Sequence, residues 1–485
     1  MTLKEKALKG VKWTAISSFA GSAAQLVQII ILTHFLSPVD FGLFAIAVIV
    51  LSFSQMFIDF GVSNAIIYKQ DITKPQLDTL YWLNIFSGIL VFVLLFFAAP
   101  IIANFYEEQR LTFLIRLISI IFLIQPYEQQ FLILLKKELL FNQIAKRDII
   151  SKIISLITAG ILAVNGFGVL ALVYAHLAGV VVSTFLMIYI GLQHHRPSLY
   201  FNFNSIKGFF KFGLFQMGES LLNYFNRDFD TILIGKLLGL EAVGIYNVAK
   251  TLAMRPAQII NPIVTQISFP VMAKLQHDIN QLKKVYLKTI DLLSTINFAI
   301  YAFVAFFAEP IIILFFGEKW HSAVLVLRIL SLYAMVRSTG NPIGALIYAR
   351  GRADLGFYWN LVLFFLIPAF VYFGSFYGVE GIAYTLLGFQ LIILLPAWKL
   401  LVNKCCGAGL VEYFKVMSLP LMVAAVQSIF YLLIIFTISS LTIQLIAGSI
   451  LFLVSSFYLN KIFNKEGYLL FRQLFQLKQP LPEGN

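Results

Sequence analysis

The chain has 485 residues, of which 60% are hydrophobic and only 12% are charged, and its mean hydropathy is +0.86. These charges are too few to cover the exterior of a water-soluble protein of this size, so a soluble globular fold is excluded. Apolar runs such as GILVFVLLFFAAPII (88–102) do not alternate in polarity, which excludes a membrane β-barrel. The composition predicts an all-α integral membrane protein.

Apolar runs of about 20 residues recur along the chain, and each is long enough to cross about 30 Å of hydrocarbon as a helix. The first run follows a basic start, MTLKEKALKGVKW, and no small-residue cleavage site ends it, so we expect a retained span and not a signal peptide. In chain order, fourteen transmembrane helices are predicted at 13–36, 40–63, 80–104, 111–135, 147–165, 168–192, 209–235, 243–271, 290–316, 323–349, 356–375, 379–398, 413–437 and 440–460.

The charges are distributed unevenly between the two sides of the predicted bundle. Lys and Arg number 36 against 23 Asp and Glu, which gives a net charge of +13. With the N-terminus inside, the external loops hold only three of the basic residues, Arg110, Lys236 and Lys319. The positive-inside rule therefore predicts that both termini are cytoplasmic, and it explains the basic balance without a nucleic-acid partner.

The first 200 residues share ordered matches with the next 200. The clearest match pairs FFAAPIIANFYEE (96–108) with FFAEPIIILFFGE (306–318), at an offset of 210. The same offset relates 166–177 to 377–387. At an offset of 202, 32–47 matches 234–249. Arg116 also pairs with Arg328. We therefore expect two parallel six-helix repeats around a central cavity. The expected parts are an N-lobe at 1–200 with helices 1–6, a C-lobe at 201–400 with helices 7–12, and 401–485 with helices 13–14 and a cytoplasmic tail.

The seventh predicted span carries charges that a lipid-facing helix does not tolerate. At 100° per residue, its polar side chains fall within an arc of about 140°, and Asp228 lies outside it. One face of this helix must therefore meet protein or water. The alternative is that Arg227 and Asp230 form a buried pair that only orders helix packing. The stripe consists of Gln216, Glu219, Ser220, Asn223, Asn226, Arg227, Asp230 and Thr231.

Two further spans carry a polar stripe. The first span has an uncharged one at offset 202, and the eighth has one with Arg255 at its edge. Three polar faces on repeat-related helices predict a hydrated transport cavity. The residues are Thr14, Ser17, Ser18, Gly21, Gln25 and Gln28 in the first span, and Asn247, Lys250, Thr251, Gln258, Asn261 and Thr265 in the eighth.

Other polar residues favour structural roles. Arg116 and Arg328 lie near the outer ends of their spans, within snorkelling reach, and Glu128 is expected to snorkel at the cytoplasmic side. The neighbouring Cys405 and Cys406, in a predicted cytoplasmic loop, are expected to remain reduced.

The trio Asp228-Phe229-Asp230 matches the D-x-D of metal-dependent glycosyltransferases. On a helix the two carboxylates point about 160° apart, so they do not share one cation. The sequence has no G-x-x-x-x-G-K-[ST] phosphate loop and no H-E-x-x-H motif, and its external loops are short. We therefore expect no enzyme, no bound metal and no cofactor.

An ordered set of motifs resembles the polysaccharide transporter family of the multidrug/oligosaccharidyl-lipid/polysaccharide flippase superfamily. The likeness is to the Wzx-type branch that includes colanic acid exporters, and it runs from about residue 4 to residue 460. The motifs are LSPVDFGLFAIA (36–47), FIDFGVSNAIIYKQDIT (57–73), GFGVLALV (166–173), FDTILIGKLLGLEAVGIYNVA (229–249) and SFPVMAKLQHD (268–278).

The resemblance implies an alternating-access flippase of the bacterial inner membrane. Its substrate would be an undecaprenyl-diphosphate-linked oligosaccharide for exopolysaccharide or lipopolysaccharide O-antigen synthesis, moved to the periplasmic leaflet with ion-gradient coupling. A polysaccharide polymerase would be a partner. An alternative from the same superfamily is a cation-coupled multidrug exporter. The implied phosphate-binding residues are Arg227, Lys250 and Arg255, the sugar-binding ones Asn223, Asn247, Gln25, Gln28 and Gln258, and the ion-coupling candidates Glu219 and Asp230.

Overall fold

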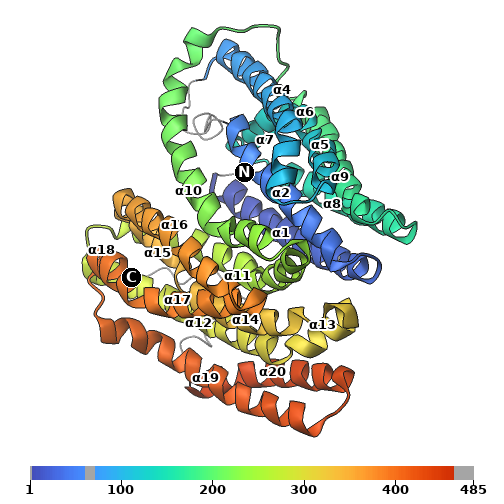
Figure 1. Cartoon of the computed structure of the whole chain (residues 1–485). Coiled ribbons are helices and arrows are strands. Elements are labelled where there is room, and N and C mark those ends of the chain that lie inside the picture. The colour runs from blue at the N-terminus through green and yellow to red at the C-terminus, as the bar shows by residue number, and fades with distance from the viewer. Residues whose placement is uncertain (1–2, 60–71, 464–485) are drawn as a thin grey trace. The chain divides into compact units, whose positions relative to one another are not determined.

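The computed structural model describes residues 3–59 and 72–463, and every regular element in these ranges is a helix (Figure 1). The chain divides into two compact units, Met1–Asn247 and Val248–Asn485. The division does not fall at the lobe boundary expected near residue 200. The reason is that α10 (Lys207–Leu237) packs along α2 (Pro38–Asp59) and so belongs to the first unit.

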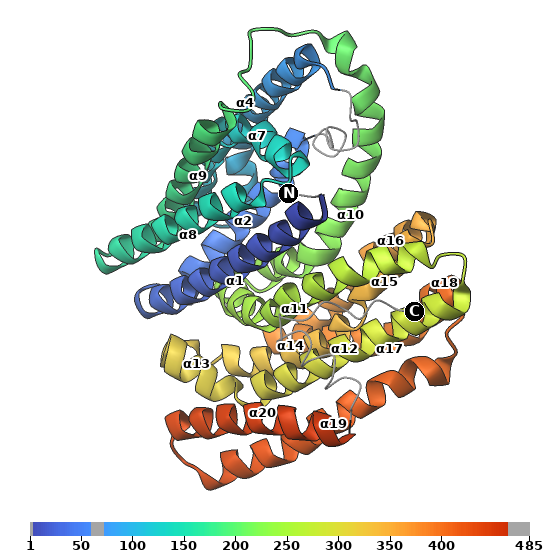
Figure 2. The same cartoon turned by 180° about the vertical axis from the view of Figure 1, so that it is seen from behind.

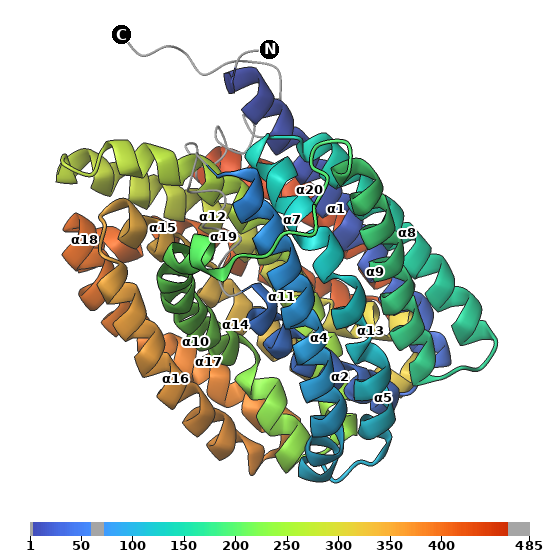
Figure 3. The ribbon, with the colours of Figure 1, turned by 90° about the horizontal axis from the view of Figure 1, so that it is seen from above.

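The first unit is a bundle of long helices. Within it α1 packs along α8 and α8 along α9, while α4 lies beside both α2 and α5 (Figures 2 and 3). Its further elements are α1 (Leu3–Phe35), α4 (Lys74–Phe105), α5 (Arg110–Ser119), α6 (Ile121–Ile124), α7 (Pro126–Lys137), α8 (Phe141–Val164), α9 (Val169–Gly191), the 3-10 turn η1 (Phe203–Ile206), and the start of α11 (Leu240–Lys274).

The second unit contains the rest of α11 and the remaining helices. Here α12 packs against both α14 and α19, and α16 pairs with α17. The elements are α12 (Ile279–Phe306), α13 (Ala308–Phe316), the 3-10 turn η2 (Glu318–Trp320), α14 (Ala323–Ser338), α15 (Asn341–Ala349), α16 (Ala353–Ser375), α17 (Gly378–Ala397), the π-helical turn η3 (Trp398–Asn403), α18 (Lys404–Cys406), α19 (Leu410–Thr437) and α20 (Leu441–Phe463).

Every predicted span overlaps helical residues within the described ranges, but not every one of these helices is long and apolar enough to span a membrane. Ten of them are long and apolar enough to span a membrane, and α5–α6 with α7 form an eleventh candidate that bends by 50°. The bend falls where Pro126 opens α7, because proline cannot donate the next backbone hydrogen bond. The other three predicted spans correspond to α8, α10 and α11, which are long helices with more polar surfaces. The tail after residue 463 and most of the 57–73 motif lie outside the described residues.

The Leu-Ser-Pro-Val-Asp motif is a helix start. The backbone N–H and the hydroxyl of Ser37 both donate to Asp40 Oδ2, at 2.9 and 2.7 Å, and Asp40 N donates back to Ser37 Oγ. Pro38 occupies the first helical position, where its missing N–H costs no hydrogen bond. The motif therefore turns the chain from α1 into α2 within two residues, 36 and 37.

Left-handed backbone recurs at matching points of the two units. Glu107 has φ +57° and Leu139 has φ +60°, although neither is glycine. The positions that align with them at offsets of 210 and 212 are Gly317 (φ +89°) and Gly351 (φ +66°). The aligned pair Gly168 and Gly378 also has positive φ, at +53° and +72°.

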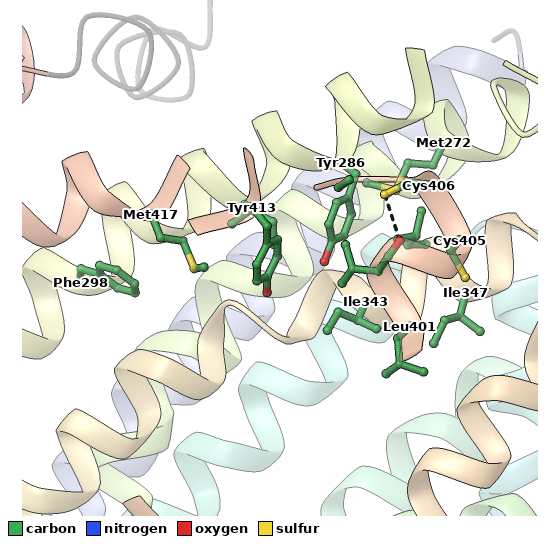
Figure 4. Close-up of a cluster of buried hydrophobic side chains, with 14 of the residues drawn as sticks. Met272, Tyr286, Phe298, Ile343, Ile347, Leu401, Cys405, Cys406, Tyr413 and Met417 are labelled. Carbon is green, nitrogen blue, oxygen red and sulfur yellow. Dashed lines mark hydrogen bonds between the residues drawn. The ribbon is translucent and has the colours of Figure 1, made fainter. Parts of the chain in front are cut away.

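A cluster of buried side chains forms the core of the second unit (Figure 4). It includes Cys405 and Cys406, and neither forms a disulfide, as predicted. The expected loop is wrong for this pair, because both residues lie in α18 and are almost completely buried. The thiol of Cys406 donates to the carbonyl oxygen of Val402, at 3.3 Å.

Candidate functional site

The helix α10 has two chemically different faces. Tyr224, Phe225 and Ile232 line an apolar cavity of about 700 Å³ in the first unit, which side chains of α2 and α4 complete. Asn223 and Arg227 lie about 100° and 60° from Tyr224 in the opposite sense of rotation from Phe225. Both of these polar side chains are exposed. Of the predicted stripe, Asn223 and Arg227 are thus exposed, whereas Asp230 and Thr231 are buried.

Arg227 forms an ion pair with the neighbouring Asp228, with 2.8 Å between Nε and Oδ2. The arginine side chain is 63% exposed, and its guanidinium carbon lies 5.8 Å from the ring centre of Tyr224. The helical wheel placed Asp228 outside the stripe, but the long arginine side chain reaches it. Much of the positive charge of Arg227 is therefore balanced within α10.

Asp230 is buried, and three hydrogen bonds satisfy its carboxylate. The hydroxyl of Tyr246 in α11 donates to Oδ2 at 2.6 Å, while the backbone N–H and hydroxyl of Thr231 donate to Oδ1 at 2.7 and 3.2 Å. Asp230 therefore links α10 to the first turns of α11.

The remaining candidates of the first unit lie on α1, α10 and α11. Gln25, Gln28 and Asn247 are half-buried. Only the backbone of Glu219 is described, and the position of its side chain lies outside the described residues.

The second unit contains the other cationic candidates, all on α11. The Nε atom of Arg255 is buried and has no hydrogen-bond partner among the described residues. Lys250 is half-buried, and Gln258 is exposed. A buried donor without a partner is costly, and a ligand oxygen would satisfy it. Arg255 is therefore the candidate whose surroundings best fit anion binding.

The next turns of α11 are irregular in sequence and are held by side chains. Pro256 and Pro262 lie inside the helix. The hydroxyl of Tyr301 in α12 accepts a hydrogen bond from the N–H of Ala257, at 3.1 Å. These contacts hold the proline-containing part of α11 against its neighbour.

Asn261, a member of the predicted stripe, is almost completely buried. It donates to the backbone oxygen of Ser338 in α14 at 3.2 Å and accepts from Asn297 in α12 at 2.9 Å. This stripe residue therefore joins three helices and does not face a cavity.

A buried ion pair in the first unit is absent from the sequence prediction. Arg147 in α8 binds Glu128 in α7 at 2.5 Å, and Ser183 in α9 donates to the same carboxylate at 2.9 Å. The side chains of Arg147 and Glu128 are only 9% and 4% exposed. The expectation that Glu128 snorkels is therefore wrong. The sequence signal is a basic and an acidic residue at similar depth in successive spans, but sequence alone does not identify them as partners.

The structural role expected for Arg116 and Arg328 is supported by their contacts. Arg116 donates from Nε to the backbone oxygen of Phe96 at 3.1 Å, and its guanidinium lies 4.5 Å from the ring centre of that residue. Arg328 donates from Nε to the backbone oxygen of Ala305 at 3.3 Å. Each arginine thus binds a carbonyl on the long helix that precedes it.

Comparison with known proteins identifies the relatives of this chain. The sequence pattern of a family described as polysaccharide biosynthesis protein matches residues 31–325. The lipopolysaccharide biosynthesis protein WzxC of Escherichia coli (strain K12) is 32% identical over 423 residues, which cover 87% of this chain and 86% of that protein. The teichuronic acid biosynthesis protein TuaB of Bacillus subtilis (strain 168) is 35% identical over 366 residues, 74% of each chain.

Solved structures with the same fold are membrane transporters. The lipid II flippase MurJ in an inward closed conformation has a TM-score of 0.75 at 15% identity, with 92% of this chain and 98% of that chain covered. An inward-facing multidrug transporter of the MATE family has a TM-score of 0.56 at 16% identity, with 81% and 100% covered. The fold is therefore that of an all-α membrane transporter.

Proposed function

This chain belongs to the polysaccharide biosynthesis protein family, and we propose that it is a flippase for undecaprenyl-diphosphate-linked oligosaccharides. The observation that carries the proposal is the large share of the chain that its relatives match. Relatives named for polysaccharide biosynthesis match most of the chain, and the same length of chain shares its fold with a lipid II flippase. The multidrug transporters share the fold over less of the chain and with a lower TM-score. This difference favours a lipid-linked saccharide over a small amphipathic drug.

The substrate class requires a polar path with cations. A diphosphate-sugar headgroup does not cross hydrocarbon unaided, because an unpaired charge there costs several kcal/mol. We infer that Arg255 makes the strongest phosphate contact, since its Nε has no hydrogen-bond partner among the described residues and arginine binds phosphate in a bidentate manner. Arg227 and Lys250 would add positive charge. Sugar hydroxyls would bind the amides of Asn223, Asn247, Gln25, Gln28 and Gln258.

We also propose fourteen transmembrane helices in two parallel six-helix repeats, an N-lobe and a C-lobe, followed by two further helices. Structural features that recur in the second repeat at nearly constant sequence offsets support this proposal. The left-handed residues Glu107 and Leu139 recur as Gly317 and Gly351. The repeat-related arginines, Arg116 and Arg328, each donate to a carbonyl of the preceding long helix.

The cellular setting follows from the substrate and the charge distribution. We propose the bacterial inner membrane, with both termini in the cytoplasm and transport toward the periplasmic leaflet. An ion gradient would drive the step. Of the two acidic candidates, Asp230 is already bonded to three neutral donors, so Glu219 is the better candidate for ion coupling. A polysaccharide polymerase would take the product.

The test is reconstitution in liposomes with an undecaprenyl-diphosphate oligosaccharide, followed by a leaflet-selective assay of its movement. Movement that depends on the protein and is faster with an imposed ion gradient is the expected result. Movement of a cationic drug without movement of the lipid-linked saccharide would favour the exporter. Absence of saccharide movement under any gradient would refute the flippase.

A further inference from the structure

Two glycines in the first unit make a reciprocal backbone contact at the starts of α2 and α11. A β-carbon on Gly42 would lie 2.8 Å from the carbonyl carbon of Leu240 and closer still to its oxygen. A β-carbon on Gly244 would lie 2.7 Å from the carbonyl carbon of Pro38 and would also overlap its oxygen. Real β-carbons do not approach other atoms this closely, so only glycine fits at either position.

The contact is symmetric in sequence as well as in space. Pro38 and Leu240 are the first residues of α2 and α11, and they align at the offset of 202 that relates 32–47 to 234–249. Gly42 and Gly244 align at the same offset, one helical turn later. Each glycine thus faces the first carbonyl of the repeat-related helix. We call these four residues the glycine seam.

Neighbouring contacts at the same end of the helices strengthen the seam. A β-carbon on Gly235 near the end of α10 would lie 2.8 Å from the ring of Tyr106 and 3.0 Å from Ile46 of α2. The ammonium group of Lys236 lies 2.8 Å from a carboxylate oxygen of Glu107. By the proposed topology all of these residues lie at the external ends of their helices.

The seam consists of backbone approach and not of interlocked side chains. The carbonyls of Pro38 and Leu240 each lie four residues before a glycine N–H, which is the spacing of the hydrogen bonds within an α-helix. What remains between the helices is dispersion and weak Cα–H···O contact, each worth little alone. The contact therefore depends on close approach of the two backbones, and a single added methyl group at Gly42 or Gly244 is enough to disturb it.

We propose that the glycine seam is the external gate of the transporter, which must separate for the headgroup to leave on the periplasmic side. This inference rests on the proposed function, since a gate has meaning only in a chain that opens to both sides. The described structure would then be the externally closed state. Transport would require α2 and α11 to part at Gly42 and Gly244.

The first test measures opening directly. Ile46→Cys places a thiol one to two turns below the seam, at a position that is fully buried. The natural Cys405 and Cys406 remain in place because both are buried. Intact cells are treated with a membrane-impermeant maleimide. We expect Gly42→Ala to raise the labelling rate of Ile46→Cys at least about fivefold, because the added methyl group forces the helices apart. The control is Gly160→Ala, a helical glycine with open space around it.

A double variant tests the reciprocity. Gly42→Ala and Gly244→Ala act on one contact, so their combined effect on labelling should be smaller than the product of the separate effects. If the two glycines act on separate packing sites, the effects multiply. Multiplicative effects, or unchanged labelling in both single variants at normal membrane levels, would overturn the gate.

A second test does not depend on how the glycine variants fold. Glu107 and Lys236 are exposed and paired, so cysteines at both positions are joined by a short, cleavable bis-maleimide. We expect the cross-link to stop movement of the lipid-linked oligosaccharide and its cleavage to restore it. Undiminished transport while cross-linked would refute the gate. Labelling that shifts as expected in a chain that moves no saccharide would support the gate and refute the proposed function.

Discussion

Removing one partner of the buried pair between Arg147 and Glu128 should strongly destabilise the first unit. The change is Glu128→Gln, which keeps the shape of the side chain and its ability to accept from Ser183. Among the described residues, Arg147 then keeps its ion pair with Asp148, at 2.9 Å, whose side chain is 42% exposed. Breaking a buried ion pair costs about 3–5 kcal/mol, and we expect the lower end because Asp148 remains. For a cooperative unit of about 250 residues, roughly 3 kcal/mol corresponds to a midpoint lower by about 6–12 °C.

The assay is thermal unfolding of the purified protein in detergent, with a double-mutant cycle. Arg147→Met should cost a similar amount alone, because it leaves the Glu128 carboxylate without its cation. The double variant Glu128→Gln/Arg147→Met should recover most of the loss, since a buried pair is replaced without leaving a lone charge. The control is Arg352→Gln, which breaks an exposed pair with Asp354 and should leave the unfolding midpoint nearly unchanged, because solvent screens such a pair. Additive losses in the double variant, or single losses no larger than the control, would refute this reasoning.

Three further predictions concern the candidate phosphate-binding arginines, His195 in the segment after α9, and Gly351 with its left-handed backbone. Arg255→Gln should reduce transport more than Arg227→Gln at equal membrane levels, because the second guanidinium is already paired; equal losses would contradict this. Burial holds the pKa of His195, after α9, below its ordinary value of 6.5, so the folded chain resists protonation and stability should fall as the pH drops below 6.5. His195→Gln should flatten that pH profile in thermal unfolding; a profile parallel to that of the unchanged protein would contradict the assignment. Gly351→Ala should lower the unfolding free energy by about 1 kcal/mol, since alanine is strained at φ +66°, and an unchanged midpoint would count against it.

The helices were predictable because their signal is local. Apolar runs of sufficient length mark α4 or α19 without knowledge of any neighbour. The exposure of Asn223 and Arg227 on one side of α10 agrees with their places on the helical wheel, where a rotation of 100° per residue sets them on the other side of Tyr224 from Phe225. The packing of α10 against α2 was not predictable, because no pattern within either helix specifies it.

The partners of charged residues are hard to predict from sequence, and the reason is geometric. A helical wheel ranks neighbours by Cβ direction, whereas Arg227 reaches Asp228 with a side chain longer than the spacing that the wheel describes. The partner of Asp230 is Tyr246, sixteen residues away on the next helix, so a single-helix projection does not contain it. The same reason explains why the sequence predicts Glu128 at the membrane surface, since its partner Arg147 lies on another helix, α8.

The proposed repeat shows which constraints persist when side chains diverge. Identity locates the pair Glu107 and Gly317, because both lie in the matching stretches at 96–108 and 306–318. It does not locate Leu139 and Gly351, since leucine and glycine share no side-chain property, yet both adopt positive φ. The seam has the opposite character, because a β-carbon at Gly42 or Gly244 would overlap a carbonyl and no strain-tolerant residue could replace the glycine. A turn that is only strained can vary between repeats, whereas a position with no room for a β-carbon must remain glycine in both. By this argument, substitutions at Leu139 should change stability alone, and substitutions at Gly42 should change the balance between open and closed states.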